Sequence, residues 1–211
     1  MLLGLTGGYC AGKNAVAALL EGRGYLCVDV DRLGHEALAG AEGARAVRAR
    51  FGEAAIGPDG GVDRKALAAA VFGDPAALAD LEAIVHPLVY RLLWALLAPA
   101  RAEGRDLCIN AALLYRMPEA ASCDAILEVR APLPLRLRRG RERDGLPPRR
   151  VLERIWSQRS FWRRRREAKR PVVVVRNGGG LDDLEAEVGR ALARAESARK
   201  AFTAPPRLPI G

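Results

Sequence analysis

The chain has 211 residues, half of them hydrophobic, and a formal net charge of +9. This length suits one sizeable domain and is short for two independent ones, and the composition excludes a disordered chain. The longest apolar runs, such as residues 172–175, are far shorter than the roughly 20 residues that a bilayer span needs, and no basic segment or cleavage site indicates a signal peptide. We therefore expect a cytoplasmic protein with no membrane partner.

The positive charge is concentrated in one segment. Residues 136–170 contain 15 Arg or Lys against 4 Asp or Glu, a local charge of +11 that leaves about −2 for the rest of the chain. A local anion site explains such a segment at least as well as a general polyelectrolyte surface, so we expect no nucleic-acid partner. A non-catalytic nucleic-acid-binding protein that uses this segment stays an alternative.

The four cysteines are Cys10, Cys27, Cys108 and Cys123, and none lies in a C-x-x-C pair. Cys27 and Cys108 each lie in a short apolar run. The pattern favours buried free thiols over disulfides or a zinc site.

Taken in chain order, short apolar runs alternate with helical patterns. We predict strands at residues 2–5, 25–30, 107–110, 125–129 and 172–175, and a helix over residues 13–22. Such alternation implies parallel pairing through crossovers, so the fold class is α/β, a three-layer arrangement with a parallel sheet of about five strands. Ligands of such sheets bind beyond the carboxyl ends of the strands.

Two stretches interrupt the alternation. Residues 33–104 look mostly helical, with a break at "GPDGGVD" (57–63), and His86 before Pro87 predicts a helix boundary. Residues 136–170 predict an Arg-rich helical pair around "DGLPPRR", in which Pro148 begins the second helix. We expect a single domain over residues 1–195 and a loose tail over 196–211, where three prolines cluster.

The first strand leads into "GLTGGYCAGKNAV" (4–16), which nearly matches the phosphate-binding pattern G-x-x-x-x-G-K-[ST]. Gly7, Gly12 and Lys13 fit, and Asn14 stands where the pattern has a hydroxyl residue. The backbone N–H groups and the following helix dipole would bind phosphate, and Lys13 would reach the β- and γ-phosphates. Because the Asn14 amide oxygen is also a hard donor, we predict a weakened or water-mediated Mg²⁺ contact. A glycine-rich turn without a ligand is the alternative.

Two carboxylates end the second predicted strand in "YLCVDVDRLGHEAL". Asp29 and Asp31 are two residues apart and project from the same face of a strand. A carboxylate there can accept a hydroxyl proton during phosphoryl transfer or orient Mg²⁺ through water. Either Asp could instead cap a helix that starts at Arg32, and we favour Asp31 as the catalytic carboxylate.

Over residues 2–192 these motifs together resemble the dephospho-coenzyme A kinase family, which belongs to the nucleoside-monophosphate-kinase-like P-loop group. "LTGGYCAGKNAVA" resembles the opening "LTGGIGSGKSTVA", and "VVVVRNGGGLDDLEAEV" resembles the last strand, Asn-x-Gly and closing helix. His86-Pro87 and the lid "RLRRGRERDGLPPRRVLERIWSQ" give most of the discrimination against other small P-loop kinases. The departures are Asn14, the pair Ala111 and Ala112 in place of Val-Pro, and Arg116 in place of Glu.

The resemblance implies transfer of a phosphoryl group from ATP to the ribose 3′-hydroxyl of dephospho-coenzyme A, giving coenzyme A and ADP. Another P-loop kinase with a nucleotide or shikimate-like acceptor is the alternative. We expect residues 33–104 to bind the acceptor, and a monomer or weak homo-oligomer.

The resemblance also assigns roles to single residues. Catalysis would use Lys13, Asp31 and Arg143. Acceptor binding would use Asp31, His86 and Arg154, although His86 could instead only fix the turn. Asn14 would contact Mg²⁺, and Asn177 and Gly178 would approach the adenine. The residues expected at ATP are Gly8, Cys10, Ala11, Gly12, Lys13, Asn14, Ala15, Arg139, Asn177 and Gly178.

Overall fold

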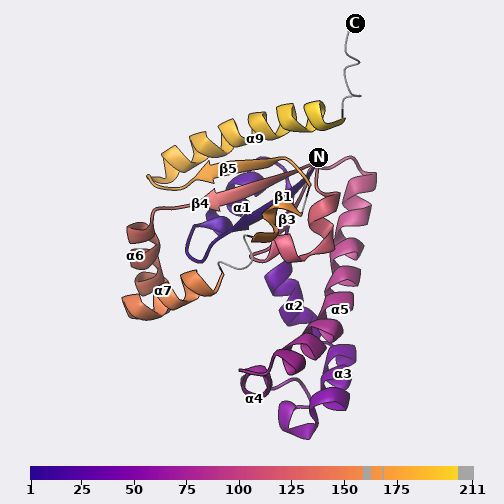
Figure 1. Cartoon of the computed structure of the whole chain (residues 1–211). Coiled ribbons are helices and arrows are strands. Elements are labelled where there is room, and N and C mark those ends of the chain that lie inside the picture. Colours follow the sequence, from indigo (N-terminus) through magenta and orange to yellow (C-terminus); the bar gives the residue numbers. More distant parts are fainter. Residues whose placement is uncertain (159–162, 168, 204–211) are drawn as a thin grey trace, which may run out of the picture. The chain divides into compact units, whose positions relative to one another are not determined.

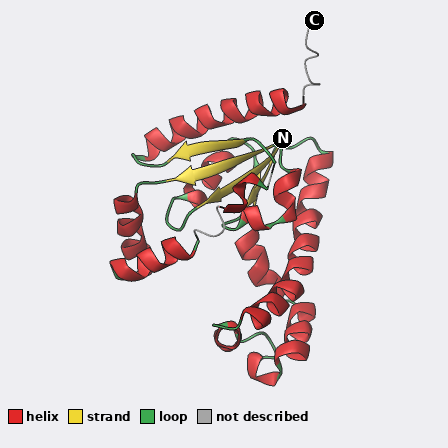
Figure 2. Ribbon diagram, viewed as in Figure 1, coloured by secondary structure: helices red, strands yellow, loops and turns green. Residues whose placement is uncertain are grey.

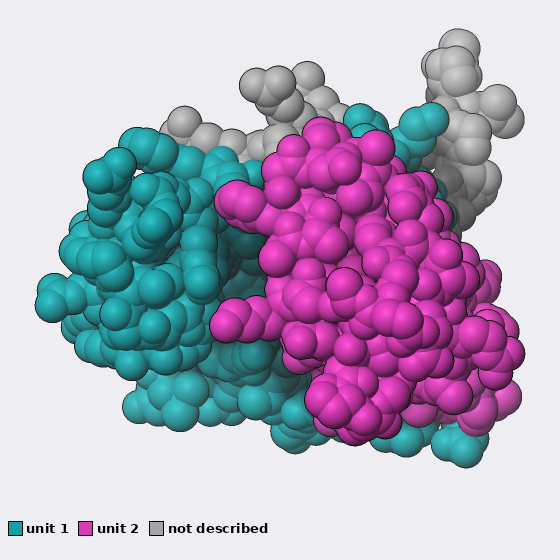
Figure 3. Space-filling view, turned by 90° about the horizontal axis from the view of Figure 1, so that it is seen from below, with its two compact units in different colours: residues 1–28, 103–211 teal, residues 29–102 magenta. Residues whose placement is uncertain are grey.

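The computed structural model describes residues 1–158, 163–167 and 169–203. The chain divides into two compact units, which Figure 3 colours separately. The first consists of Met1–Val28 with Glu103–Gly211, and the second is Asp29–Ala102. The second unit spans nearly the same residues as the helical region expected from the sequence. We describe each unit by itself.

The first unit is built on a five-stranded parallel sheet, seen in Figures 1 and 2. The strands lie in the order β2-β3-β1-β4-β5. Their bounds are β1 (Leu2–Gly7), β2 (Leu26–Asp29), β3 (Leu107–Asn110), β4 (Ala125–Arg130) and β5 (Val172–Arg176). β1 is buried along its whole length, with Leu5 opposite Asn110 of β3 and Gly7 opposite Val129 of β4. The predicted α/β fold and the number of strands are confirmed.

Two helices cover one face of this sheet. α1 (Lys13–Glu21) and α9 (Leu181–Thr203) contact each other, and α9 lies along β4 and β5 (Figure 1). Fully buried side chains of strands and helices form one core, including Leu5, Leu127, Leu20 and Val188. Burial of this apolar area is the main stabilising contribution, because each fully buried Leu contributes about 1.5–3 kcal/mol.

The predicted loose tail is wrong for residues 196–203, because α9 continues to Thr203. Ala195 is fully buried on the sheet side, and Glu196 pairs with Arg199 and Lys200 at helical spacing. These contacts extend the helix past the point where the prolines suggested an end. Residues 204–211 lie outside the described residues.

The Arg-rich segment contains the two predicted helices, α6 (Leu133–Asp144) and α7 (Pro148–Ser157), and Pro148 begins the second as expected. Gly145 ends α6 in the left-handed conformation, with φ of 64° and its N–H bonded to the Arg141 carbonyl at 3.0 Å. The two helices approach closely at Gly140, where an added Cβ would lie 2.8 Å from Val151 Cγ1. Residues 159–162 and 168 of the expected lid lie outside the described residues.

Short 3₁₀ helices complete the described part of the first unit. They are η2 (Leu114–Arg116), η3 (Pro118–Ser122) and η4 (Arg163–Arg166). All four cysteines are free, with Cys10, Cys108 and Cys123 buried and Cys27 half-buried. A hydrogen bond with Cys27, together with burial, raises the pKa of the Cys108 thiol, which therefore stays protonated.

The second unit is helical. It contains α2 (Val30–Ala39), α3 (Ala41–Phe51), η1 (Glu53–Ala55), α4 (Arg64–Val71) and α5 (Pro75–Ala102). A small core is formed by Val47, Ala55 and Leu67, with Phe51 and Leu81 packed against it. Ion pairs between α3 and α5, Arg50–Asp80 and Arg91–Glu42, lie at 2.5 Å on the surface of the unit.

The predicted helix boundary at His86 is wrong, because α5 runs through Pro87 and Pro99. A proline inside a helix removes one backbone hydrogen bond and costs roughly 3 kcal/mol. The helix continues because α5 packs against α2, α3 and α4 and buries Leu88, Leu93 and Leu97, which offsets that loss. By length and composition alone α5 could also cross a membrane, a weak indication because core helices meet the same criterion.

Candidate functional site

The phosphate loop connects β1 to α1 as the glycine pattern predicts. Gly12 has a φ of 93° and Cys10 a φ of 58°, so both adopt the left-handed conformation. The Gly12 carbonyl accepts hydrogen bonds from the N–H groups of Ala15 (3.1 Å) and Val16 (3.3 Å), which begins the helix. The helix N-terminus and the loop N–H groups therefore lie together, an arrangement that binds phosphate.

Two predicted ATP ligands from other elements meet at this loop. Asn177 follows β5, where its N–H bonds to the Arg130 carbonyl at 2.7 Å, and its side chain donates to the Ala11 carbonyl at 2.9 Å. Arg139 of α6 donates to Asn177 Oδ1 at 3.0 Å. An added Cβ on Gly12 would come closer than 3.0 Å to Asn177 Nδ2, so this contact requires glycine. The next residue, Gly178, packs near Pro132.

Arg136, also on α6, contacts the loop and was missed in the sequence analysis. Its Nε donates to the Tyr9 carbonyl at 2.7 Å, and a Cβ on Gly8 would lie 2.7 Å from its Nη2. Burial lowers the pKa of the Arg136 guanidinium, which still leaves it a cation at neutral pH. The sequence signal that could have identified Arg136 is its spacing from Arg139 and Arg143, which places the three residues on one helix face.

A cavity of about 380 Å³ lies at this end of the loop, lined by Cys10, Gly12, Arg139, Glu142 and Arg143. Because Cys10 and Gly12 belong to the loop, this cavity is the candidate phosphate pocket.

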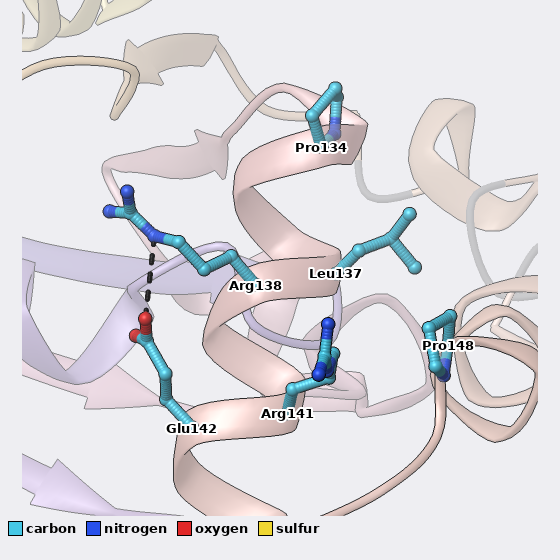
Figure 4. A pocket seen from close by; sticks show the side chains of 6 residues that line it. All are labelled: Pro134, Leu137, Arg138, Arg141, Glu142 and Pro148. Carbon is cyan, nitrogen blue, oxygen red and sulfur yellow. Dashed lines mark ion pairs between the residues drawn. The ribbon is translucent and has the colours of Figure 1, made fainter.

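A second hollow, of about 640 Å³, is shown in Figure 4. Arg138 and Glu142 form an ion pair at 3.6 Å there. The residues that line it are Pro134, Leu137, Arg138, Arg141, Glu142 and Pro148. Although it is larger, it contains no loop residue, so we assign it no ligand.

The predicted lid residues Arg143 and Arg154 converge on one carboxylate. Arg143 binds Asp144 through Nε (2.8 Å) and Nη2 (3.0 Å), and Arg154 Nη1 lies 3.2 Å from Asp144 Oδ2. Hydrogen bonds from Arg143 and Tyr9 hold the pKa of Asp144 well below its usual value of 3.8, and the same pairing raises the pKa of Arg143. The structure therefore brings these two arginines together beside the loop residue Tyr9.

Asp31 and His86 belong to the second unit. Asp29 is the N-cap of α2, because its Oδ1 accepts from the N–H groups of Asp31 (2.9 Å) and Arg32 (3.2 Å). Asp31 lies in the first turn and is exposed, and His86 is exposed on α5. Capping of α2 was the alternative role considered for both carboxylates, and the structure shows that Asp29 is the cap. The roles of Asp31 and His86 stay predictions.

Two amide side chains of the first unit, Asn14 and Asn110, are candidates to face a metal ion. Asn14 is exposed in the first turn of α1, and Asn110 ends β3 with 3% exposure. Asn110 Oδ1 is buried and makes no hydrogen bond within the described part of the chain. Asn110 pairs with Leu5, so it lies on the sheet face that α1 covers. The described residues contain no cluster of three or more His, Cys, Asp or Glu suited to a metal.

Mg²⁺ accepts neutral amide oxygens, so these two donors fit the ion. Asn110 was missed because its only sequence signal was a polar residue at the end of an apolar strand.

A phosphate loop follows the first strand of the parallel sheet, and arginines of the Arg-rich segment donate hydrogen bonds to carbonyl groups of this loop. These features define a P-loop phosphotransferase. A family model described as dephospho-CoA kinase matches residues 1–183, and the chain belongs to this family. The predicted family, enzyme class and function are thereby confirmed, and the enzyme is an ATP-dependent kinase.

Similar proteins cover nearly the whole chain. A dephospho-CoA kinase of Frankia casuarinae is 41% identical over 88% of this chain and 80% of its own length. One of Anaeromyxobacter dehalogenans is 38% identical over 97% of this chain and 98% of its own length. A crystal structure of a Thermus thermophilus protein matches with a TM-score of 0.76 and 36% identity, covering 92% of this chain and 97% of that one.

Proposed function

We propose that this chain transfers the γ-phosphoryl group of ATP to the ribose 3′-hydroxyl of dephospho-coenzyme A. The 3′-oxygen forms the new bond to the γ-phosphorus while the bond to the β-phosphate bridging oxygen breaks, and ADP leaves. The proton of the hydroxyl passes to the Asp31 carboxylate. The observation that carries this proposal is the Gly12 loop held by Asn177 and Arg139 in a chain of this family.

Positive charge around the transferred group is the main catalytic contribution of the first unit. Loop N–H groups and Lys13 bind the β- and γ-phosphates, and Arg139 and Arg143 line the phosphate pocket. Arg143 and Arg154 have planar guanidinium groups that can bind phosphate oxygens bidentately. These donors stabilise charge as it spreads over the γ-oxygens.

The second unit supplies the acceptor side. Its helices would hold dephospho-coenzyme A, with His86 and Asp31 as its ligands. Asp31 is a suitable base because Asp29 already caps α2, so the Asp31 carboxylate is not needed for the cap. In the free protein both side chains are exposed to solvent.

Asn14 and Asn110 would hold Mg²⁺ beside the nucleotide phosphates. When bound, the ion neutralises phosphate charge. Two neutral amides attract a cation less than a carboxylate does, so most of the attraction comes from the nucleotide itself. Mg²⁺ should strengthen ADP binding, and we expect this strengthening to be larger in Asn110→Asp than in the wild type. Calorimetry of ADP binding with and without the ion measures it. An unchanged gain would remove Asn110 from the metal site.

The proposal is tested by incubating purified protein with ATP, Mg²⁺ and dephospho-coenzyme A, beside several nucleoside monophosphates. We expect coenzyme A and ADP only with the first acceptor. Lys13→Ala should abolish turnover while circular dichroism shows an unchanged fold, and Asp31→Asn should bind both substrates but transfer phosphate at least a hundredfold more slowly. Preferred phosphorylation of a nucleotide, or full activity of either variant, contradicts the assignment.

We also propose a cytoplasmic location and a monomeric or weakly associating state. The family membership supports the first, because the substrates are soluble metabolites. Sedimentation at increasing protein concentration tests the second, and a tight oligomer at all concentrations contradicts it.

A further inference from the structure

Tyr9, in the middle of the phosphate loop, contacts the lid segment through its backbone and its side chain. Its N–H donates to Gln158 Oε1 at 2.6 Å, and its carbonyl accepts from Arg136 Nε at 2.7 Å. The phenol donates to Asp144 Oδ2 and accepts from Arg154 Nη1 at 3.2 Å. These partners lie 127 to 149 positions later in the chain.

The aromatic ring of Tyr9 also contacts two cations. The guanidinium carbons of Arg143 and Arg154 lie 5.2 and 5.4 Å from the ring centroid. Arginine near an aromatic face is attracted by the electron density of the ring. Both guanidinium groups also contact the Asp144 carboxylate, so they lie near each other and their positive charges repel. The negative charge of Asp144 and the electron density of the ring offset this repulsion.

We propose that Tyr9 is a positioning residue that holds Arg143 and Arg154 at the phosphate loop, ready for the γ-phosphate of ATP. This inference rests on the proposed function, in which these arginines bind the transferred group. Long arginine side chains lose much rotamer freedom when they bind a ligand. Holding them in place beforehand reduces that loss, so the triphosphate binds more tightly.

The phenol and the ring contribute separately, which makes the role testable by graded substitution. Tyr9→Phe keeps the ring but removes the hydrogen bond to Asp144 and the one from Arg154. Tyr9→Ala removes both kinds of contact but leaves the backbone bonds. Because a hydrogen bond to a charged group changes an equilibrium by roughly tenfold or more, we expect Tyr9→Phe to lower ATP affinity about tenfold and Tyr9→Ala further.

The measurement is calorimetric binding of ATP and of ADP to each variant, without acceptor. A positioning role predicts a loss for ATP that clearly exceeds the loss for ADP, because only ATP carries the γ-phosphate. A purely structural role lowers the melting temperature and weakens both nucleotides alike. Tyr25→Phe is the matched control, since Tyr25 is a buried tyrosine of the same unit that lies outside the loop.

A double-mutant cycle with Asp144→Asn tests the route of the effect. If Tyr9 acts through Asp144 and the arginines, the second substitution adds little to the loss caused by Tyr9→Phe. Equal ATP-to-ADP affinity ratios in wild type, Tyr9→Phe and Tyr9→Ala would overturn the inference.

Failure of the proposed function is a separate result. Wild type that binds ATP but does not phosphorylate dephospho-coenzyme A would refute the acceptor, while the affinity ratios still decide the role of Tyr9.

Discussion

Replacing Gly12 with alanine should destabilise the phosphate loop for two reasons that can be separated. A non-glycine residue in the left-handed conformation costs about 1–2 kcal/mol, and Gly12 has a φ of 93°. The new Cβ would also displace Asn177, which would lose its hydrogen bonds to Ala11 and Arg139. At about 1 kcal/mol for each bond, the free energy of unfolding should fall by about 3–4 kcal/mol in total.

Gly24 provides the matched control. Its φ of 88° is close to that of Gly12, but an added Cβ there meets no atom within 4 Å. Gly24→Ala should therefore lose only the backbone contribution, about 1–2 kcal/mol. Urea unfolding gives both free energies, and in thermal melts each kcal/mol should lower Tm by roughly 2–4 °C for a protein of this size.

The Asn177→Ala background isolates the second contribution. With the amide already absent, Gly12→Ala should cost no more than Gly24→Ala does. The reasoning would be refuted if Gly12→Ala and Gly24→Ala had equal effects in the wild-type background. It would also be refuted if the effect of Gly12→Ala were the same with and without Asn177.

Two further predictions concern buried ionisable groups of the first unit. Burial raises the pKa of Tyr25 to about 12, so the unfolded chain loses this proton first and stability should fall by roughly 2–3 kcal/mol as pH rises from about 10 to 12. In alkaline unfolding, the stability of Tyr25→Phe should not show this decrease. If the variant and the wild type had the same pH profile of stability, the prediction would be contradicted. Glu128 is 1% exposed, accepts a hydrogen bond from the Tyr115 hydroxyl (2.8 Å) and forms ion pairs with Arg130 (2.5 Å) and Arg165 (2.8 Å). Glu128→Gln should cost about 1–3 kcal/mol in urea unfolding, because both arginines lose their charged partner while their own exposure limits the loss.

The amino-acid order alone was enough to predict the parts of the fold that depend on local backbone chemistry. Apolar runs of strand length gave the five strands, and Gly7, Gly12 and Lys13 gave the phosphate loop, because glycine permits the left-handed turn and parallel strands direct their carboxyl ends to one edge. The family motifs then led from the loop to the kinase activity.

The contacts between side chains far apart in the chain became visible only in the folded protein. Folding brought Tyr9 to Asp144, and it buried the Asn110 oxygen beside β1, where no described residue forms a hydrogen bond with it. It also carried α5 through Pro87, because side-chain burial against neighbouring helices outweighed a lost backbone hydrogen bond. Such outcomes depend on packing between segments far apart in the chain, and no local pattern of residues encodes them.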